Sequence, residues 1–227
     1  MANNNDNGQN NAIDNINDSL TGLGAKVQNN QKIIFIATGI LALIVLGVLV
    51  YIYAFRDPKI QAGNEAIGQA DLELALGNDS LALQQFMAVA DKHGFDAGNR
   101  AALQAAILLY EKGDYQQALK YVDKFDSDEK IVGPAALSLK GDCLVNLDQL
   151  DKAADAFRAA IAKSDKNPAY TPFFMLKLAR VYREQKDYAK EADIYAEILK
   201  EYPLYGDKNN IDIEKYLQRA RIQAEKK

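Results

Sequence analysis

Cys143 and His93, the only cysteine and the only histidine in the sequence, are of residue types that could form a nucleophilic pair. A histidine beside a thiol lowers the pKa of that thiol and activates it. Cys143, however, falls on a helix expected to begin at Pro134 and has no catalytic motif around it, and His93 is expected to end a helix before Gly94. We therefore interpret Cys143 as a structural cysteine. A site built from several histidines is excluded because there is only one.

No other stretch has the spacing that catalysis or a cofactor requires. The acidic residues Asp126, Asp128 and Glu129 lie in an expected loop, where solvated charges are usual. The sequence lacks a G-x-x-x-x-G-K-[ST] phosphate loop, a G-x-G-x-x-G turn after a strand and a G-x-S-x-G elbow. The net charge of −4, from 27 basic and 31 acidic residues, is spread along the chain, which argues against nucleic acid as a partner. The sequence predicts a non-enzymatic protein without cofactor, metal or small-molecule substrate.

Residues 33–55 form an unbroken run without a charge. A helix of that length reaches about 34 Å, enough to cross a hydrocarbon core of roughly 30 Å. The alternative is a cleaved signal peptide, but a long polar segment, residues 1–32, precedes the run and no small-x-small cleavage site follows it. We therefore expect a retained membrane anchor, with Tyr51, Tyr53 and Phe55 at one membrane interface.

Residues 1–32 contain ten Asn, few apolar groups and no aromatic ring, so we expect a polar and largely disordered tail. One amphipathic segment interrupts it, because five apolar residues share a helical face at spacings of 3, 4, 3 and 4. They are Ile13, Ile16, Leu20, Leu23 and Val27. We favour a helical lead-in on the membrane surface over a docking helix for a partner, because Gly22 and Gly24 weaken helix formation.

The charges beside the apolar run do not orient the anchor. Lys26 and Lys32 lie on its N-terminal side, and Arg56 and Lys59 lie on the other. The positive-inside count is therefore tied, and these residues leave the orientation open.

Asp57 and Pro58 are expected to be an N-cap and a first-turn proline, and a helical pattern follows to the end of the chain. Within this pattern one motif recurs at nearly even intervals. The copies are GNDSLALQQF at 77–86, GDYQQALKYV at 113–122, DQLDKAADAF at 148–157 and KDYAKEADIY at 186–195. A period of about 34 residues, with a turn, a small residue and then a bulky one a helical turn later, is typical of tetratricopeptide repeats, which are helix pairs.

Each repeat needs a small residue where its two helices cross and a larger residue that fills the space toward the next repeat. The expected small residues are Ala70, Ala106, Gly141 and Ala179 on the first helices and Ala82, Ala118 and Ala153 on the second helices. The expected larger residues are Phe86, Val122, Phe157 and Tyr195. The fourth repeat departs from this pattern, since Glu191 stands at the small position with Ala192 beside it, so its second helix is expected to be rotated or shifted.

Residues 210–227 predict a terminal amphipathic helix that caps the last repeat. Its inward residues are expected to be Ile213, Tyr216, Leu217 and Ala220. The sequence as a whole therefore predicts an all-α protein: one N-terminal transmembrane helix followed, over residues 56–227, by an α-solenoid of about four helix pairs with a C-terminal capping helix.

This organisation resembles the YfgM-like ancillary subunits of the Sec translocon, in which a short segment and one membrane helix precede a tetratricopeptide array. The stretches that carry the resemblance, similar to the version of the family seen in Bacteroidota, are NDSLALQQFMAVADKHGFDAGNRAALQAA at 78–106 and YTPFFMLKLARVYREQKDYAKEADIYAEILKEYP at 170–203. It implies an inner-membrane protein with a cytoplasmic N-terminus and a periplasmic array. The implied partners are the translocon, emerging envelope polypeptides and periplasmic chaperones. The Asn-rich tail departs from the more charged tail of that family.

The first helices of such an array line a concave surface that suits polypeptide partners. The residues expected there are Arg100, Leu103, Ile107, Tyr110, Ser138, Asp142, Asn146, Phe173, Lys177, Arg180 and Arg183. Four of them are basic, so we expect a locally positive surface that favours acidic or extended segments. A clamp for a C-terminal carboxylate is not expected, because Ser138 and Asp142 stand where a Lys and Asn pair would be needed.

Three alternatives stay open at this point. The partner could contact another face of the array or the membrane helix, leaving the concave surface solvated. The array could serve as a scaffold for another assembly or secretion complex of the cell envelope. The protein could also be an enzyme whose site has no recognised motif.

Overall fold

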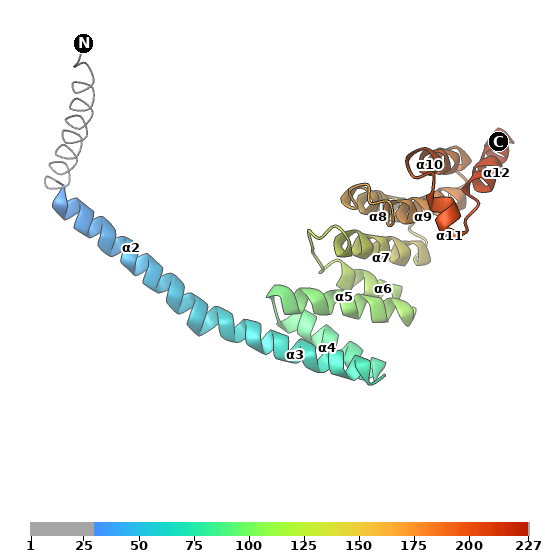
Figure 1. Ribbon diagram of the computed structural model, residues 1–227. Helices are drawn as coiled ribbons and strands as arrows, with labels where there is room; N and C mark the ends of the chain where they lie inside the picture. The colour runs from blue at the N-terminus through green and yellow to red at the C-terminus, as the bar shows by residue number, and fades with distance from the viewer. Residues whose placement is uncertain (1–29, 227) are drawn as a thin grey trace, which may run out of the picture. The chain divides into compact units, whose positions relative to one another are not determined.

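The computed structural model of the protein describes residues 30–226, and in this part of the chain all regular structure is helical (Figure 1). The chain divides between Pro58 and Lys59 into two units, each of which is described by itself. The predicted tail, with its amphipathic segment from Ile13 to Val27, lies outside the described residues.

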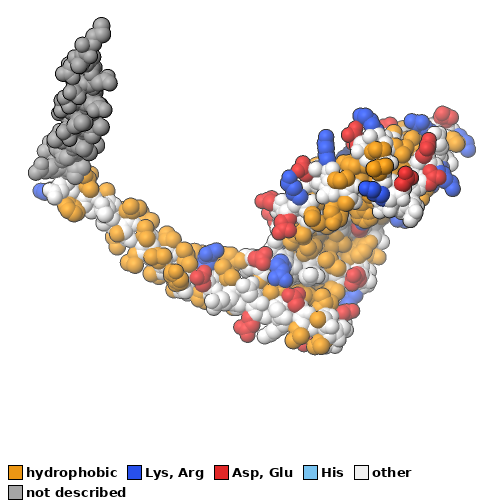
Figure 2. All heavy atoms as spheres, in the orientation of Figure 1, with side chains coloured by type: hydrophobic (Ala, Val, Ile, Leu, Met, Phe, Trp, Pro, Cys, Tyr) orange, Lys and Arg blue, Asp and Glu red, His pale blue; other side chains and the backbone are white. Residues whose placement is uncertain are grey.

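The first unit contains helix α2 (Gln31–Tyr51) and the π-helical turn η1 (Ile52–Arg56). Neither element has a buried residue, and hydrophobic side chains cover α2 in Figure 2. By its length and composition α2 could cross a membrane. The predicted apolar helix is thus present, whereas the domain limits at residues 33 and 55 stay a prediction.

The expected role of Asp57 as an N-cap residue is wrong. Asp57 has helical backbone angles, φ −63° and ψ −43°, and its N–H donates to the carbonyl oxygen of Ile52, five residues earlier. Helix α3 (Asp57–Ala75) follows η1 directly in the sequence. The proline at position 58 accounts for the wide turn, because its ring and its missing N–H disturb a regular α-helical turn.

The second unit stacks pairs of helices, and from α4 to α10 each helix packs on the next in the sequence (Figure 1). Ile67 and Ala70 of α3 belong to the same buried cluster as α4, α5 and α6. The remaining helices are α4 (Asp79–Lys92), α5 (Phe95–Glu111), α6 (Tyr115–Val122), α7 (Val132–Asn146), α8 (Leu150–Lys163), α9 (Thr171–Glu184), α10 (Tyr188–Glu201), α11 (Tyr205–Asn209) and α12 (Ile213–Glu225).

The predicted contacts within the repeats are confirmed. The six alanines at the helix crossings, Ala70, Ala82, Ala106, Ala118, Ala153 and Ala179, are each 0% exposed. Gly141 is buried as well, and a Cβ added to it would lie 2.6 Å from the ring of Phe157. Since that separation is far below van der Waals contact, α7 and α8 can approach this closely only because position 141 has no side chain.

The turn that opens each motif copy needs a left-handed backbone. Gly77 and Gly113 both have φ +79°, and Asp148 and Lys186, at the same place in the third and fourth copies, have φ +58° and +60°. Glycine adopts this conformation without steric cost, whereas other residues are strained there. The repeat pattern therefore follows from a backbone requirement that two of the four sequences meet with glycine.

The second helix of the fourth repeat is not rotated, contrary to our expectation. Glu191 is only 1% exposed, and Tyr195 and Ile198 are 4% and 0% exposed, so α10 buries the same positions as the helices before it. The Glu191 carboxylate accepts a hydrogen bond of 3.0 Å from the guanidinium of Arg219 on α12. The ion pair to the last helix lets a buried charge occupy the place of a small residue.

The capping helix is present, and it begins later than expected. Asp212 is the N-cap residue of α12, and its carboxylate accepts a hydrogen bond of 2.9 Å from the backbone N–H of Lys215. Ile213, Leu217 and Ala220 are buried on α10, as predicted, and Tyr216 is half-buried. The short helix α11 before it was not anticipated.

Replacing Gly141 with Leu is expected to lower the free energy of unfolding by about 1 to 3 kcal/mol, because the new side chain would overlap the ring of Phe157. Ala153→Leu should act similarly at the same crossing. Ala135→Leu, at an exposed position of α7, is the matched control. Urea unfolding of the full chain in detergent, followed by circular dichroism, measures the change, and unchanged unfolding in both variants would refute the register of the third repeat.

Lys186→Gly is expected to raise the free energy of unfolding by roughly 1 kcal/mol, because glycine removes the strain of a left-handed lysine. Gly113→Ala should lower it by a similar amount at the equivalent turn. Thermal unfolding of both variants beside the parent chain provides the measurement. A loss of stability in Lys186→Gly would contradict the assigned backbone strain.

Candidate interaction surface on the first helices

The first-helix surface, as we call the predicted set of residues on α5, α7 and α9, has a connected centre. Tyr110 comes from α5, Asp142 and Asn146 come from α7, and Lys177 and Arg180 come from α9. Each pair of successive first helices is separated by a complete second helix in the sequence, so only the stacking of repeats can bring these side chains together.

Lys177 is the residue that ties this centre together. Its ammonium group donates a hydrogen bond to the carboxylate of Asp142 and also forms an ion pair with it. The same Nζ lies 4.9 Å from the centre of the Phe173 ring and 5.9 Å from that of Phe157. These contacts hold the Lys177 cation between a carboxylate and aromatic faces.

Burial shifts the pKa values of two titratable groups in this centre, Asp142 and Tyr110. Burial raises the pKa of Asp142, while Lys177 and then Arg180 lower it. Burial also raises the pKa of Tyr110, helped by the charge of Asp142 and opposed by a hydrogen bond with Asn146. These effects link α5, α7 and α9 electrostatically.

The surface is less positive than the sequence predicted. Arg100 lies 3.5 Å from the carboxylate of Asp71 on α3, and Arg180 lies 3.6 Å from that of Glu184. With Lys177 paired to Asp142, three of the four predicted cations face an acid. The charges therefore nearly balance, because acidic residues one helix or one turn away neutralise them.

Not every predicted residue reaches the surface. Ser138 is 3% exposed, and its hydroxyl has no hydrogen-bond partner among residues 30–226. This prediction is therefore corrected, because position 138 faces the interior of the repeat. Leu103 and Ile107 are half-buried, and Leu103 packs against the core of the first repeats. Arg183 is half-buried and its charge acts on the Tyr195 hydroxyl.

Cys143 and His93 do not form a reactive pair. Cys143 is 0% exposed, and burial raises the pKa of its thiol to about 12, with Asp142 adding to the rise. A thiol with that pKa stays protonated at neutral pH and is a poor nucleophile. His93 follows the last residue of α4, as predicted. Among residues 30–226, no group of three or more His, Cys, Asp and Glu side chains is placed to hold a metal ion.

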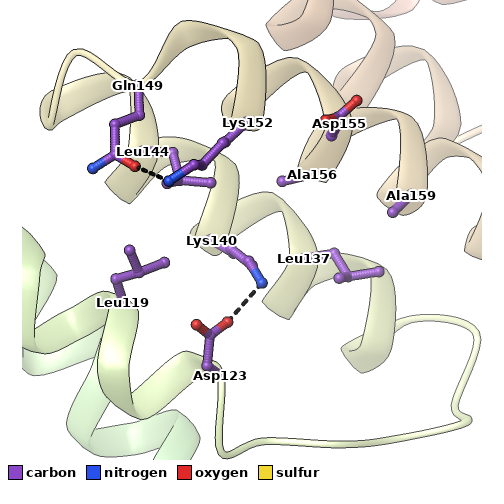
Figure 3. A pocket seen from close by; sticks show the side chains of 10 residues that line it. All are labelled: Leu119, Asp123, Leu137, Lys140, Leu144, Gln149, Lys152, Asp155, Ala156 and Ala159. Carbon is purple, nitrogen blue, oxygen red and sulfur yellow. Dashed lines mark hydrogen bonds and ion pairs between the residues drawn. The ribbon is translucent and has the colours of Figure 1, made fainter.

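The structure contains a hollow that the sequence did not predict (Figure 3). It has a volume of about 420 Å³ and lies among α6, α7 and α8. Asp123 and Lys140 both line the hollow, and the dashed line between them in Figure 3 marks their ion pair of 2.7 Å. The hollow exists because α6 ends at Val122 after 8 residues, whereas α4, α8 and α10 each have 14. The polar run from Asp126 to Lys130 is the sequence signal for this early end.

Comparison with known protein families supports the assignment of tetratricopeptide repeats. Residues 57–182 match the family described as Tetratricopeptide repeat-like domain, and residues 174–205 match the family described as Tetratricopeptide repeat. No curated protein sequence matches the chain.

Several solved structures share the fold. A crystal structure of MamA is 21% identical, with a TM-score of 0.50, and the match covers 69% of this chain and 95% of that one. Another MamA structure is 20% identical, with a TM-score of 0.51 and coverage of 72% and 92%. A crystal structure of TPR-like repeats from a putative kinesin light chain of Podosopora anserina is 11% identical to this chain. The TM-score is 0.50, and the match covers 72% of this chain and 95% of that one. At these identities the likeness concerns the fold alone.

Lys177→Met is expected to lower the free energy of unfolding by about 1 to 3 kcal/mol at pH 7, because it leaves Asp142 charged, part-buried and without its cation. Removing Lys177 should raise the pKa of Asp142 further. A carboxyl group whose pKa is higher in the folded than in the unfolded state favours folding once it is protonated. The loss should therefore shrink as the pH falls from 7 toward that raised pKa.

Urea unfolding between pH 7 and pH 4.5 tests this expectation in the full chain. Adding Asp142→Asn to Lys177→Met should restore much of the stability at pH 7, since the unpaired charge is gone. Lys152→Met on α8, whose ammonium group donates to the uncharged Gln149 side chain, serves as the control. A loss that is independent of pH and is not rescued by Asp142→Asn would exclude the proposed role of the ion pair.

Proposed function

Because this chain belongs to the tetratricopeptide repeat-like family, we propose that it is a non-enzymatic scaffold that binds protein partners on its first-helix surface and is anchored in a membrane by α2. The family supports the general role, since stacked helix pairs present long surfaces for protein partners. The apolar composition of α2 supports the anchor.

The observation that carries the binding surface is the continuous centre across α5, α7 and α9. The side chain of Phe173 is 44% exposed beside Lys177, so an aromatic face and a fixed cation are offered together. Tyr110 and Asn146 extend this centre with groups that can hydrogen-bond a peptide backbone. An extended polypeptide with an apolar side chain for Phe173 fits this arrangement better than a strongly acidic one, because most of the cations are already paired.

We propose further that the partner complex is the Sec translocon, with the N-terminus in the cytoplasm and the array in the periplasm of an inner-membrane protein. The order of the parts, a short segment, one apolar helix and a repeat array, supports this through the resemblance to YfgM-like ancillary subunits. Emerging envelope polypeptides and periplasmic chaperones are the partners that this role implies.

The alternative is a scaffold of another assembly or secretion complex of the cell envelope. The balanced charges around α2 favour neither orientation, and Ser138 and Asp142 stand where a clamp for a C-terminal carboxylate would need Lys and Asn. Identification of the bound partner separates the two candidates.

A photo-crosslinking residue in place of Asn146, in the full chain expressed in membranes, is expected to capture the partner for identification by mass spectrometry. Combining Phe173→Ser with Arg180→Glu should lower the crosslinking yield on the order of five-fold, as the loss of about 1 kcal/mol at an interface predicts. Both side chains are exposed, so the melting temperature should change little.

The control for this experiment is Lys152→Glu, which changes an exposed charge on α8, away from the first helices. Its crosslinking should equal that of the parent chain. Undiminished crosslinking by the folded double variant would remove the first-helix surface from the proposal, and a partner outside the translocon would refute the finer assignment.

A further inference from the structure

The turns that join each repeat to the next carry a row of exposed apolar side chains. Phe95 is the first residue of α5, and Ile131, Tyr170 and Leu204 are the N-cap residues of α7, α9 and α11. They are 49%, 52%, 41% and 62% exposed. One of them occurs in each successive turn between repeats, so the stacking of repeats places them in register along one edge of the array. We call this edge, defined by these four residues, the inter-repeat edge.

The opposite edge of the array differs. It is formed by the turns within the repeats, and in the second to fourth repeats the exposed residues of these turns are polar. They include Glu111, Lys112, Asn146, Asp148, Glu184 and Lys186. No exposed large apolar residue of repeats two to four lies in these turns within the described chain. In repeats two to four the exposed apolar residues of the turns thus lie at one edge, whereas in the first repeat Leu76 is exposed at the opposite edge.

A hollow adjoins the inter-repeat edge at its C-terminal end. It has a volume of about 500 Å³ and lies between the turn before α9 and the turn around α11. Its walls include Pro168, Tyr202, Pro203 and Tyr205, beside Leu204. At this end, apolar residues therefore line a hollow in addition to standing exposed in the turn.

The chain enters the array at this same edge. Gly63 of α3 lies against the start of α5, where a Cβ on it would be 3.1 Å from the Cβ of Ala97 and 3.5 Å from that of His93. The second unit begins at Lys59, and Phe55 is the last residue of the apolar run. The four residue steps between them span at most about 14 Å even when fully extended. Only a short stretch of chain therefore joins the apolar run to this edge.

We propose that the inter-repeat edge rests on the surface of the phospholipid bilayer, with Phe95, Ile131 and Tyr170 in the interfacial region. This inference rests on the membrane anchor of the proposed function. Aromatic and branched apolar side chains favour the boundary between headgroups and acyl chains. Single apolar residues on successive turns, separated by polar ones, suit a fluid interface, whereas a protein interface needs a contiguous apolar centre.

Charge does not draw the turn at Ile131 toward anionic lipid. Lys130 adjoins Ile131, but Asp126, Asp128 and Glu129 stand in the same turn, and Lys130 itself pairs with Asp165. This turn thus carries no basic excess for anionic headgroups. The contact comes from burial of the apolar side chains, so zwitterionic phosphatidylcholine is the appropriate probe.

The test uses tryptophan as a depth reporter, because the chain contains none. Phe95→Trp and Tyr170→Trp each place a single indole on the inter-repeat edge, and Leu76→Trp places one at an exposed apolar position on the opposite edge. Each full-length variant is reconstituted in vesicles of phosphatidylcholine with or without brominated acyl chains. Brominated lipid is expected to quench the two edge variants at least two-fold and to leave Leu76→Trp nearly unchanged.

Vesicle flotation, measured on the same samples, separates failure of the anchor from failure of this inference. Protein that does not float with the vesicles would overturn the anchor and the inference together. Protein that floats while the edge variants are quenched no more than Leu76→Trp would overturn the bilayer contact alone. Blue-shifted edge emission without quenching would also overturn it, since it would show burial against protein, such as a second copy of the chain.

Discussion

The two helices of a repeat can lie close together only where a small residue stands at their crossing. In the third repeat that residue is Gly141, and the ring of Phe157 occupies the space that a side chain would need. The alanines at the other crossings are fully buried and serve the same purpose. Because the crossing fixes how far each repeat is displaced from the last, it also determines that α5, α7 and α9 present one shared surface.

The packing at the helix crossing is different in the fourth repeat, after which no further repeat follows in the described chain. Glu191 replaces the small residue, and a buried carboxylate of this kind requires a cation to offset the cost of removing it from water. Arg219 supplies the cation from α12, at 3.0 Å, while its own side chain stays partly exposed. The charge pair thereby makes the last repeat specific for a capping helix, since another repeat with alanine at its contact would leave Glu191 unpaired.

Repetition made most of the array predictable, because each residue type could be checked against its equivalents in other repeats. Features that occur in only one repeat could not be checked against equivalent positions in this way. The early end of α6 at Val122 and the π-helical turn before Pro58 each occur once and have no periodic signal. The charges of the first-helix surface were assigned to the correct helices, but their pairing depends on acids such as Asp71 and Asp142, whose distances only the packed structure fixes.

That pairing limits how the first-helix surface can recognise a partner. An acidic segment would have to draw Lys177 away from Asp142, leaving a part-buried carboxylate without its cation, and this cost opposes binding. Phe173 can be covered without breaking any ion pair, since its exposed face is open while Lys177 stays with Asp142. Recognition through apolar contact with Phe173, surrounded by polar groups, is therefore favoured over recognition by charge. Such a surface suits partners that have an extended apolar segment but no common sequence.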